Sequence, residues 1–266
     1  MKIALIQMAV VDNKEKNLLN AKEKIHEAAL KGSQIICLPE MFNCPYDNRY
    51  FKAYAEDDFG QTITMIQSLA KKHNCIIIAG SIPEKYEEKI YNTSYIVNAE
   101  GKIISKHRKV HLFDVTIENG IKFKESEILT PGNQITVINT PLAKIGVAIC
   151  YDMRFPEVIR KMTLEGVEIV FIPAAFNMTT GPAHWHTIAK ARGLDNQLYM
   201  ALCSPARDIN ASYIAYGHSL IANPWGEVEK ELDEKEGILI HEVNLKAVES
   251  TRESLPLLKH RKPELY

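Results

Sequence analysis

A cysteine ends the apolar run 144–150 (KIGVAIC), which predicts a buried strand. A helix is predicted to begin near Phe155, and Pro156 suits its first turn. Cys150 would then occupy a strand-to-helix corner, where a nucleophile can be exposed while the strand holds its backbone rigid. Backbone N–H groups just beyond the corner can face a developing oxyanion. The alternative is a small core residue, because free cysteines are commonly buried. The polar residues that follow Cys150 favour the functional interpretation.

Two further residues could share in this chemistry. Glu40 follows the apolar run IICLP, and a carboxylate there points into a cleft because burying it unpaired is costly. A solvated loop acid is the alternative, and position alone does not decide between them. Lys109 lies in SKHRKVHLFD, a basic run that continues into apolar residues, so part of it must enter the protein. Either Arg108 or Lys109 is then drawn inside, where a lysine needs a carboxylate or a task, and spacing does not choose between them.

Three histidines offer a rival mechanism. His111, His184 or His186 could be the base of a Cys–His dyad with Cys150. His184 and His186 lie two residues apart in GPAHWHT, which places them on different sides of a helix, and no third metal ligand is apparent. Packing or hydrogen bonding is therefore favoured for both, and no metal ion is expected.

The composition restricts the partners and the compartment. Basic and acidic residues nearly balance, at 32 against 33, so nothing favours nucleic acid or an anionic membrane as a partner. No apolar run reaches the roughly eighteen residues that a membrane-spanning helix needs. The number of cysteines is odd, five, and no C-x-x-C pair occurs. A reduced, cytoplasmic protein fits this pattern better than a disulfide scaffold or a zinc site.

The elements that must position these residues alternate between strand and helix, which predicts an α/β layered fold. Helices are expected at residues 14–31, 62–72, 155–165 and 182–197 and near the C-terminus. Strands are expected at residues 3–10, 34–39, 75–81, 91–98, 102–107, 135–140, 144–150, 167–173, 198–204, 218–224 and 237–243. The two halves repeat one order, which suggests two sheets packed face to face with helices outside each. No linker separates them, so residues 1–266 are expected to form one domain, with a polar tail at 251–266 that reaches a partner subunit.

Three segments together resemble the signature segments of the nitrilase superfamily. They are LPEMF around Glu40, HRKVHLFD around Lys109 and GVAICYDMRFPE around Cys150. The resemblance covers nearly the whole chain. Other segments look most like those of the omega-amidase branch. Two of them, CPYDNRYF and FKESEILTPG, precede the Cys150 strand, and the later ones are FNMTTGPAHW, ARGLDNQ, SPARD, YGHS and NPWGE.

This resemblance implies a fold, an assembly and a reaction. The family fold is an α-β-β-α sandwich with two mixed sheets, and its members associate into homodimers or larger forms. The omega-amidase branch hydrolyses the terminal amide of 2-oxoglutaramate and 2-oxosuccinamate to the 2-oxo acid and ammonia through a cysteine thioester. Glu40 would be the base and Cys150 the nucleophile. Lys109 and the backbone N–H of Tyr151 would hold the oxyanion, without a metal or organic cofactor.

Three more residues have two interpretations each. Glu125 matches a second family glutamate that orients Lys109 and the substrate, although spacing alone favours an exposed loop acid. Arg154 is a bidentate partner for the substrate carboxylate or, alternatively, pairs with Glu157 in the first helical turn. Tyr46 covers the pocket mouth or is an ordinary surface tyrosine.

Other functions are compatible with the same three segments. Neighbouring branches of the superfamily hydrolyse N-carbamoyl amides or nitriles. A protein of a different class, a catalytically silent binding protein, has no need of all three residues Glu40, Lys109 and Cys150.

Overall fold

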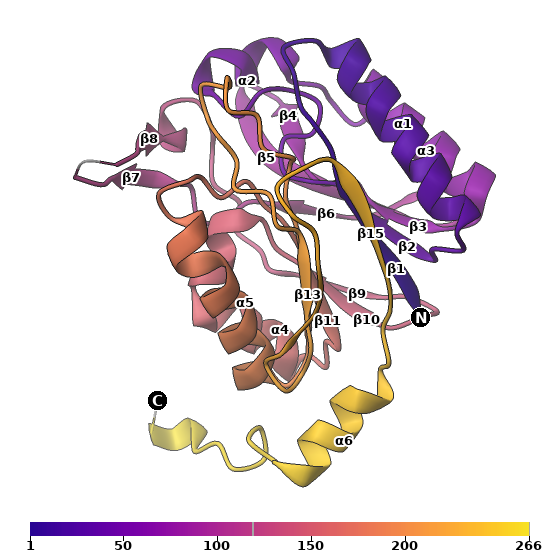
Figure 1. The fold of residues 1–266 in the computed structure, drawn as a ribbon, viewed down its shortest axis with the longest axis vertical. Helices are drawn as coiled ribbons and strands as arrows, with labels where there is room; N and C mark the ends of the chain where they lie inside the picture. The colour runs from indigo at the N-terminus through magenta and orange to yellow at the C-terminus, as the bar shows by residue number, and fades with distance from the viewer. Residues whose placement is uncertain (119, 266) are drawn as a thin grey trace.

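Two β-sheets lie face to face at the centre of the protein in this computed structural model, which describes residues 1–118 and 120–265 (Figure 1). The first sheet has the strand order β15-β1-β2-β3-β5-β4, and β6 pairs with β5. Its strands are β1 (Lys2–Gln7), β2 (Ile35–Cys37), β3 (Ile76–Ile78), β4 (Ile82–Tyr86), β5 (Lys89–Val97), β6 (Ile103–Arg108) and β15 (Gly237–Glu242). Strands β1, β2 and β3 run parallel and their neighbours antiparallel, so the sheet is mixed.

The second sheet has the order β14-β13-β12-β11-β10-β9 and is mixed as well. Its strands are β9 (Thr136–Asn139), β10 (Lys144–Val147), β11 (Ile169–Pro173), β12 (Tyr199–Cys203), β13 (Leu220–Ala222) and β14 (Val228–Glu231). The parallel strands β10, β11 and β12 are mostly apolar because both of their faces are buried.

Alternation along β1 shows how one strand serves two layers. Ile3 and Leu5 point into the core between the two sheets, where they join Ile145 of β10. Ala4 and Ile6 point the other way, into a core shared with helices. A one-residue shift in register would therefore exchange the residues of the two cores.

Helices cover the outer face of each sheet (Figure 1). Helices α1 (Lys14–Leu30) and α3 (Gln61–His73) pack on the first sheet, and α4 (Pro156–Leu164) and α5 (Gly181–Asn196) pack on the second. Asn13 caps α1 by accepting a hydrogen bond from the Lys16 N–H. Pro156 stands in the first turn of α4, as predicted. The predicted four-layer α-β-β-α sandwich is confirmed.

The structure differs from the prediction where the chain leaves regular strands. Strand β15 follows the second half in sequence but pairs with β1 of the first sheet, so the two halves do not form separate sheets. Strand β10 ends at Val147 and not at Cys150, because the chain turns there into the 3₁₀ segment η2 (Cys150–Arg154). Short elements without a clear apolar period were missed: α2 (Asn48–Tyr54), β4, β7 (Asp114–Thr116), β8 (Lys122–Lys124), η1 (Glu125–Glu127) and β14.

The C-terminal segment crosses the end of the molecule below α4 and α5 in Figure 1. Helix α6 (Lys246–Ser254) is attached through the Arg252 guanidinium, which donates to the carbonyl oxygens of Gln197 and Val167. The chain then continues to a short 3₁₀ turn, η3 (Pro263–Leu265). The predicted contact of this tail with a partner subunit stays a prediction, and Tyr266 lies outside the described residues.

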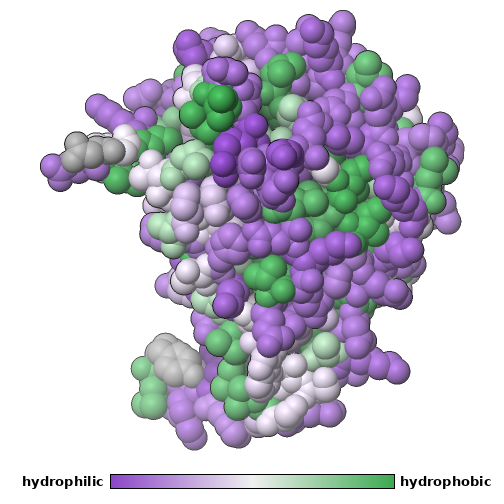
Figure 2. All heavy atoms as spheres, in the orientation of Figure 1, coloured by the Kyte–Doolittle hydropathy of each residue, from purple (hydrophilic) through white to green (hydrophobic). Residues whose placement is uncertain are grey.

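The surface of the protein contrasts with its interior. Hydrophilic residues cover most of the face shown in Figure 2, and hydrophobic residues appear between them in smaller areas. In the described part of the chain, no helix is both long and apolar enough to cross a membrane.

Candidate active site

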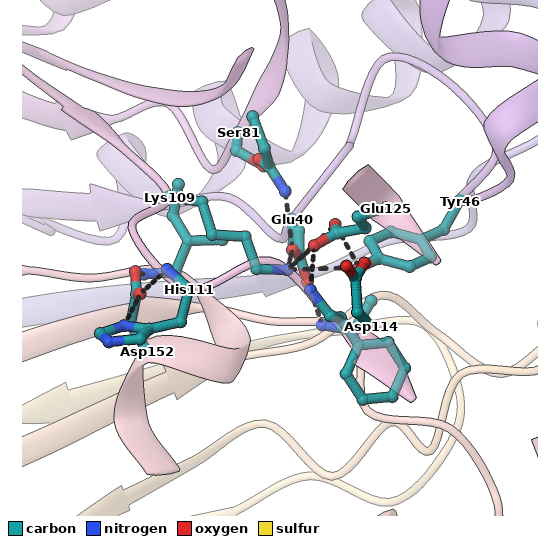
Figure 3. Close-up of polar contacts among 12 residues, drawn as sticks. Glu40, Tyr46, Ser81, Lys109, His111, Asp114, Glu125 and Asp152 are labelled. Carbon is teal, nitrogen blue, oxygen red and sulfur yellow. Dashed lines mark hydrogen bonds and ion pairs between the residues drawn. The ribbon is translucent and has the colours of Figure 1, made fainter. Parts of the chain in front are cut away.

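The residues predicted to do chemistry come together where strands of both sheets end. Glu40 lies just beyond β2, and Lys109 directly follows β6 of the same sheet. Cys150 begins the 3₁₀ segment after β10 of the opposite sheet. Figure 3 shows the Lys109 side chain extending toward Glu40, Glu125 and Tyr46.

Lys109 is completely buried and makes three hydrogen bonds. Its Nζ donates to Oε1 of Glu40 at 2.8 Å, to Oε1 of Glu125 at 3.0 Å and to the Tyr46 hydroxyl at 3.3 Å. Burial alone lowers a lysine pKa, but the negative charges of Glu125 and Glu40 outweigh it and raise the pKa of Lys109 well above its ordinary value. The ammonium therefore stays charged.

Arg108 faces away from this site, which settles the choice that spacing left open. Its guanidinium donates to both carboxylate oxygens of Glu84, at 2.7 and 2.8 Å. Successive residues of a strand point to opposite faces, so Arg108 and Lys109 cannot share a side of β6.

Glu40 is held by donors on both carboxylate oxygens. Asn92 Nδ2 donates to Oε1 at 2.8 Å, beside Lys109, and the Ala175 N–H donates to Oε2 at 2.8 Å. Burial raises the pKa of Glu40, the Lys109 charge opposes this, and the charge of Glu125 adds to the increase, so the net pKa is raised. Glu40 is thus a carboxylate with an enhanced tendency to accept a proton.

Gly80 lets the chain bring Glu40 to its place. Its φ is +48°, and a Cβ atom there would lie 2.1 Å from the Pro39 carbonyl oxygen. A glycine is therefore required where the end of β3 approaches the segment that carries Glu40. The next residue, Ser81, also holds this segment, because its Oγ accepts a hydrogen bond from the Met41 N–H at 3.0 Å.

Cys150 has a backbone conformation that is rare for a residue with a side chain. Its φ is +46°, in the left-handed region, and only 4% of the residue is exposed. Burial, followed by the charge of the nearby Glu40 carboxylate, raises the pKa of the Cys150 thiol well above its ordinary value, against the opposing effect of the Lys109 charge. The resting thiol is therefore protonated, and a nearby base must remove its proton before it can attack.

A buried carboxylate holds the turn that carries Cys150. Oδ2 of Asp152 accepts the Ile149 N–H at 3.1 Å and lies 3.0 Å from His107 Nε2, and Oδ1 lies 2.8 Å from His111 Nδ1. Burial raises the Asp152 pKa, but the hydrogen bonds from His107 and His111 reverse this and lower it below its usual range. Asp152 thereby ties the chain before and after Cys150 to β6.

None of the three candidate histidines bonds to Cys150 within the part of the chain that the structure describes. His111 is held by Asp152 and stacks on Phe155 at a centroid distance of 3.7 Å. His184 Nδ1 lies 3.2 Å from an Arg154 nitrogen, and His186 lies beside Glu231. The geometry thus favours Glu40 over a histidine as the partner of the thiol.

Glu125 and Tyr46 are both buried, which overturns the exposed alternatives considered for them. Glu125 accepts the Phe113 N–H on Oε2 at 2.6 Å and the Tyr46 hydroxyl on Oε1 at 2.7 Å. Spacing favoured a loop acid because the short β7–β8 hairpin that folds Glu125 inward gives no clear period in the sequence. Both residues contact Lys109.

Arg154 lies close to Cys150 but does not pair with Glu157. Its guanidinium lies 4.6 Å from the centroid of the Phe176 ring and 3.2 Å from His184 Nδ1, and no ion pair joins it to an acid among the described residues. Its Nε is buried without a hydrogen-bond partner, and burial lowers its pKa from the ordinary value. The alternative interpretation, a surface pair with Glu157, is therefore not found, and the guanidinium has no carboxylate partner within the described part of the chain.

Tyr151 follows the nucleophile and offers its backbone. No described residue accepts a hydrogen bond from the Tyr151 N–H group. The Tyr151 ring packs edge-on against Phe113 at 5.3 Å and Phe155 at 5.5 Å, which fixes the start of η2.

A cavity of about 370 Å³ opens next to this cluster. Glu40, Tyr46 and Ala175 contribute to its wall, together with the segment 205–215, which includes Tyr213. The Tyr213 hydroxyl donates to the Ala175 carbonyl at 2.5 Å, and its ring lies 4.6 Å from that of Tyr46. Sequence analysis missed Tyr213, because nothing in a polar loop indicates which residue folds inward.

Asn92 was missed as well, although the sequence carried a signal for it. It lies in β5, an otherwise buried strand, and a fully buried amide requires partners. That partner is Glu40.

Known proteins share this fold and these segments. The family model described as carbon-nitrogen hydrolase matches residues 2–253. The chain is 45% identical over 265 residues to "Omega-amidase NIT2-A" of Xenopus laevis, covering 100% of this chain and 96% of that protein. It is 44% identical over 267 residues to "Nitrilase homolog 2" of Dictyostelium discoideum, covering 100% of this chain and 81% of that protein.

A solved structure agrees in fold. The crystal structure of Saccharomyces cerevisiae Nit3, a member of branch 10 of the nitrilase superfamily, superposes with a TM-score of 0.91 at 40% identity and covers 98% of this chain and 96% of that one. The chain belongs to the carbon-nitrogen hydrolase family, within the nitrilase superfamily. It is accordingly a hydrolase of carbon–nitrogen bonds.

Proposed function

We propose that the protein is an omega-amidase, which hydrolyses the terminal amide of small 2-oxo acid monoamides such as 2-oxoglutaramate and 2-oxosuccinamate. One observation carries the proposal: Glu40, Lys109 and Cys150 form a buried cluster beside a cavity, and close by lies the Arg154 guanidinium, which has no carboxylate partner among the described residues. Full-length similarity to proteins named omega-amidase supports the same substrate class.

The first half of the proposed reaction forms a thioester. Glu40 takes the proton from Cys150 Sγ, and the thiolate attacks the amide carbon. The Lys109 ammonium and the Tyr151 N–H stabilise the negative oxygen of the tetrahedral intermediate, and one such donor contributes about 3–4 kcal/mol. Of the three hydrogen bonds of Lys109, the longest, to Tyr46 at 3.3 Å, is the one most easily exchanged for the oxyanion.

The second half of the reaction regenerates the enzyme. Glu40 returns its proton to the leaving nitrogen, the carbon–nitrogen bond breaks, and ammonia departs. Glu40 then takes a proton from water, which attacks the thioester, and gives it to Cys150 Sγ as the acid product leaves. Glu125 positions Lys109 throughout, because its carboxylate accepts a hydrogen bond from the same ammonium that bonds to Glu40.

Substrate choice is assigned to Arg154 and Tyr46. A guanidinium can bind the free carboxylate of the substrate through two parallel hydrogen bonds, and the buried, unpaired Nε of Arg154 supports this role. Tyr46 contributes to the cavity wall next to Glu40 and closes that side of the pocket.

The setting of the enzyme is also a proposal. A cytoplasmic location is supported by five free cysteines, all buried. Assembly into a homodimer or larger homo-oligomer, with α6 and the following tail at an interface, is suggested by the way this segment projects from the body (Figure 1).

Ammonia release from three substrates tests the substrate class. The purified protein would receive 2-oxoglutaramate, an N-carbamoyl amino acid and a small nitrile, each at the same concentration. We expect the oxo acid amide to react fastest by at least about tenfold in kcat/KM. A preference for the carbamoyl compound or the nitrile would place the protein in a neighbouring branch. No reaction with any of the three would favour a silent binding protein.

A further inference from the structure

Two histidines and one carboxylate meet at a place away from the active site. His186 belongs to α5, His218 lies just before β13, and Glu231 ends β14. His186 Nε2 and His218 Nδ1 each lie 2.8 Å from Glu231 Oε1, and the three ligand atoms lie within 4.8 Å of one another. We propose that these three side chains form a binding site for a divalent transition-metal ion, with Zn²⁺ as its best occupant.

The ligand types select this class of metal ion. Imidazole nitrogens and one carboxylate oxygen suit Zn²⁺, whereas Mg²⁺ and Ca²⁺ require a shell of oxygen atoms. Zinc binds such atoms at about 2.0–2.2 Å, which separates tetrahedral ligands by roughly 3.4 Å. The two distances of 2.8 Å from the imidazole nitrogens to Glu231 Oε1 therefore need to increase only slightly, and solvent water can complete the coordination.

His218 is held in a conformation that directs its ring to this point. Its φ is +58°, a left-handed backbone conformation that few residues other than glycine adopt. The His218 N–H donates to the Asp233 carbonyl at 3.1 Å, and its own carbonyl accepts the Trp185 Nε1–H at 2.7 Å. The Tyr216 ring stacks on the imidazole at 4.3 Å. Local strain that the surroundings maintain is a mark of functional positions.

The site is accessible to an ion from solvent. The side chains of His186, His218 and Glu231 are 34%, 23% and 31% exposed. The sequence around His186 did not indicate the other two ligands, because they belong to β14 and to the segment before β13, far along the chain. His184, its neighbour in sequence, points to Arg154 and takes no part.

A bound ion would stabilise the region without joining the reaction. It would link α5 to β14 and to His218, which lies three residues beyond the segment 205–215 that forms part of the cavity wall. We therefore expect zinc to raise the thermal midpoint, because it binds the folded state, while turnover does not depend on it. This inference does not rest on the proposed substrate.

Calorimetric titration of Zn²⁺ tests the site directly. The full-length Cys150→Ala variant is used for binding, since it removes the active-site thiol as a competing zinc ligand. We expect one Zn²⁺ per chain, and His186→Ala, His218→Asn and Glu231→Gln should each weaken binding more than about tenfold. Asparagine at 218 tolerates the left-handed backbone, so that this variant separates loss of a ligand from loss of the fold.

The chain offers a matched control. His241 Nε2 lies 2.6 Å from Glu229 Oε2, a histidine–glutamate pair that no second histidine joins in the described part of the chain. His241→Ala should leave zinc affinity unchanged. Equal weakening by His241→Ala, or no effect of any of the three ligand variants, would contradict the site, as would the absence of zinc binding to Cys150→Ala.

The Co²⁺ spectrum of the wild-type protein gives a readout that needs no variant. Nitrogen and oxygen ligands at a tetrahedral site should give visible d–d bands. An intense thiolate-to-cobalt band would place the ion on a cysteine and overturn the assignment.

Discussion

Strand β6 serves two carboxylate–cation clusters that lie on its opposite sides. Lys106 and Arg108 bond to Glu84 on one side, and Lys109, just beyond the strand, bonds to Glu40 on the other. Both glutamates are buried, yet the pKa of Glu84 is lowered and that of Glu40 is raised.

The difference arises from how many cations each carboxylate has. Burial raises the pKa of both, but at Glu84 the hydrogen bonds from Arg108, Thr93 and Lys106 together outweigh it. At Glu40 the one cation in contact among the described residues, Lys109, is shared with Glu125, whose charge adds to the effect of burial. Two cations keep the Glu84 carboxylate ionised by lowering its pKa. One cation shared by two carboxylates leaves Glu40 with a raised pKa, so that it can accept a proton.

The largest expected effect concerns the nucleophile that only one cluster contains. Cys150→Ala should lower turnover by at least about a thousandfold, because no other group can form the thioester. The fold should persist, since the removed sulfur atom is small. Ammonia release and circular dichroism measure the two effects, and retention of more than a few per cent of activity would refute the assignment.

The two glutamates provide a direct test of the contrast. Glu40→Gln should lower kcat by roughly a hundred- to ten-thousandfold, because a general base is lost, with little change in stability. Glu84→Gln should instead leave kcat near the wild-type value and lower the free energy of unfolding by about 2 kcal/mol at neutral pH, through loss of hydrogen bonds to a charged group.

The stabilisation that Glu84 provides should decrease in acid. The folded-state pKa of Glu84 lies below its unfolded value, so its stabilisation is present above the unfolded pKa and is lost as pH falls through the folded one. The stability difference between wild type and Glu84→Gln should thus shrink in acid, as measured by urea unfolding at several pH values. A loss of kcat in Glu84→Gln equal to that in Glu40→Gln would remove the distinction between the clusters.

The layers and the reactive segments could be predicted from the sequence, for a physical reason. Buried parallel strands are continuous apolar runs, and Glu40 and Cys150 interrupt such runs at the point where strands end. The family resemblance then chose Lys109, which residue types alone could not separate from Arg108. That choice depends on which face of β6 meets the second sheet, and this is decided by pairing with β5 across the chain.

The remainder of the site depends on contacts between distant segments. Tyr213 and Ala175 reach the cavity through loops without periodic pattern, and the φ of +46° at Cys150 leaves no trace in residue type. The pairing of Glu125 with Lys109 results from a short hairpin that no period indicates. Sequence patterns therefore reveal site residues at the ends of regular strands, and they do not reveal site residues that lie in irregular loops.

Substitution of Arg154 should lower activity less than substitution of Cys150 or Glu40, and the loss should depend on the substrate. Arg154→Ala should lower kcat/KM for 2-oxosuccinamate by about ten- to a hundredfold, the loss of one charge-assisted contact. A neutral amide of similar length should lose less. Arg154→Lys should not restore the rate fully, because an ammonium lacks the planar pair of donors.

The kinetic comparison has a clear contrary result. An equal loss for the charged and the neutral amide would mean that Arg154 maintains the site through Phe176 and His184 and does not contact the carboxylate.

The smallest expected effect sharpens the contrast between a shared and an unshared cation. Glu125→Gln removes a negative charge that raises the pKa of Glu40, and it leaves Lys109 with a single carboxylate. Both changes stabilise ionised Glu40, so the acidic limb of kcat/KM should move to lower pH. Wild type should show this limb above the ordinary glutamate value of about 4.5. Glu84→Gln is the control and should leave the limb in place, because Glu84 does not affect the Glu40 carboxylate. A limb that moves to higher pH in Glu125→Gln would mean that Glu125 acts mainly by holding the Lys109 ammonium against Glu40, and that charge sharing does not set the basicity of the site.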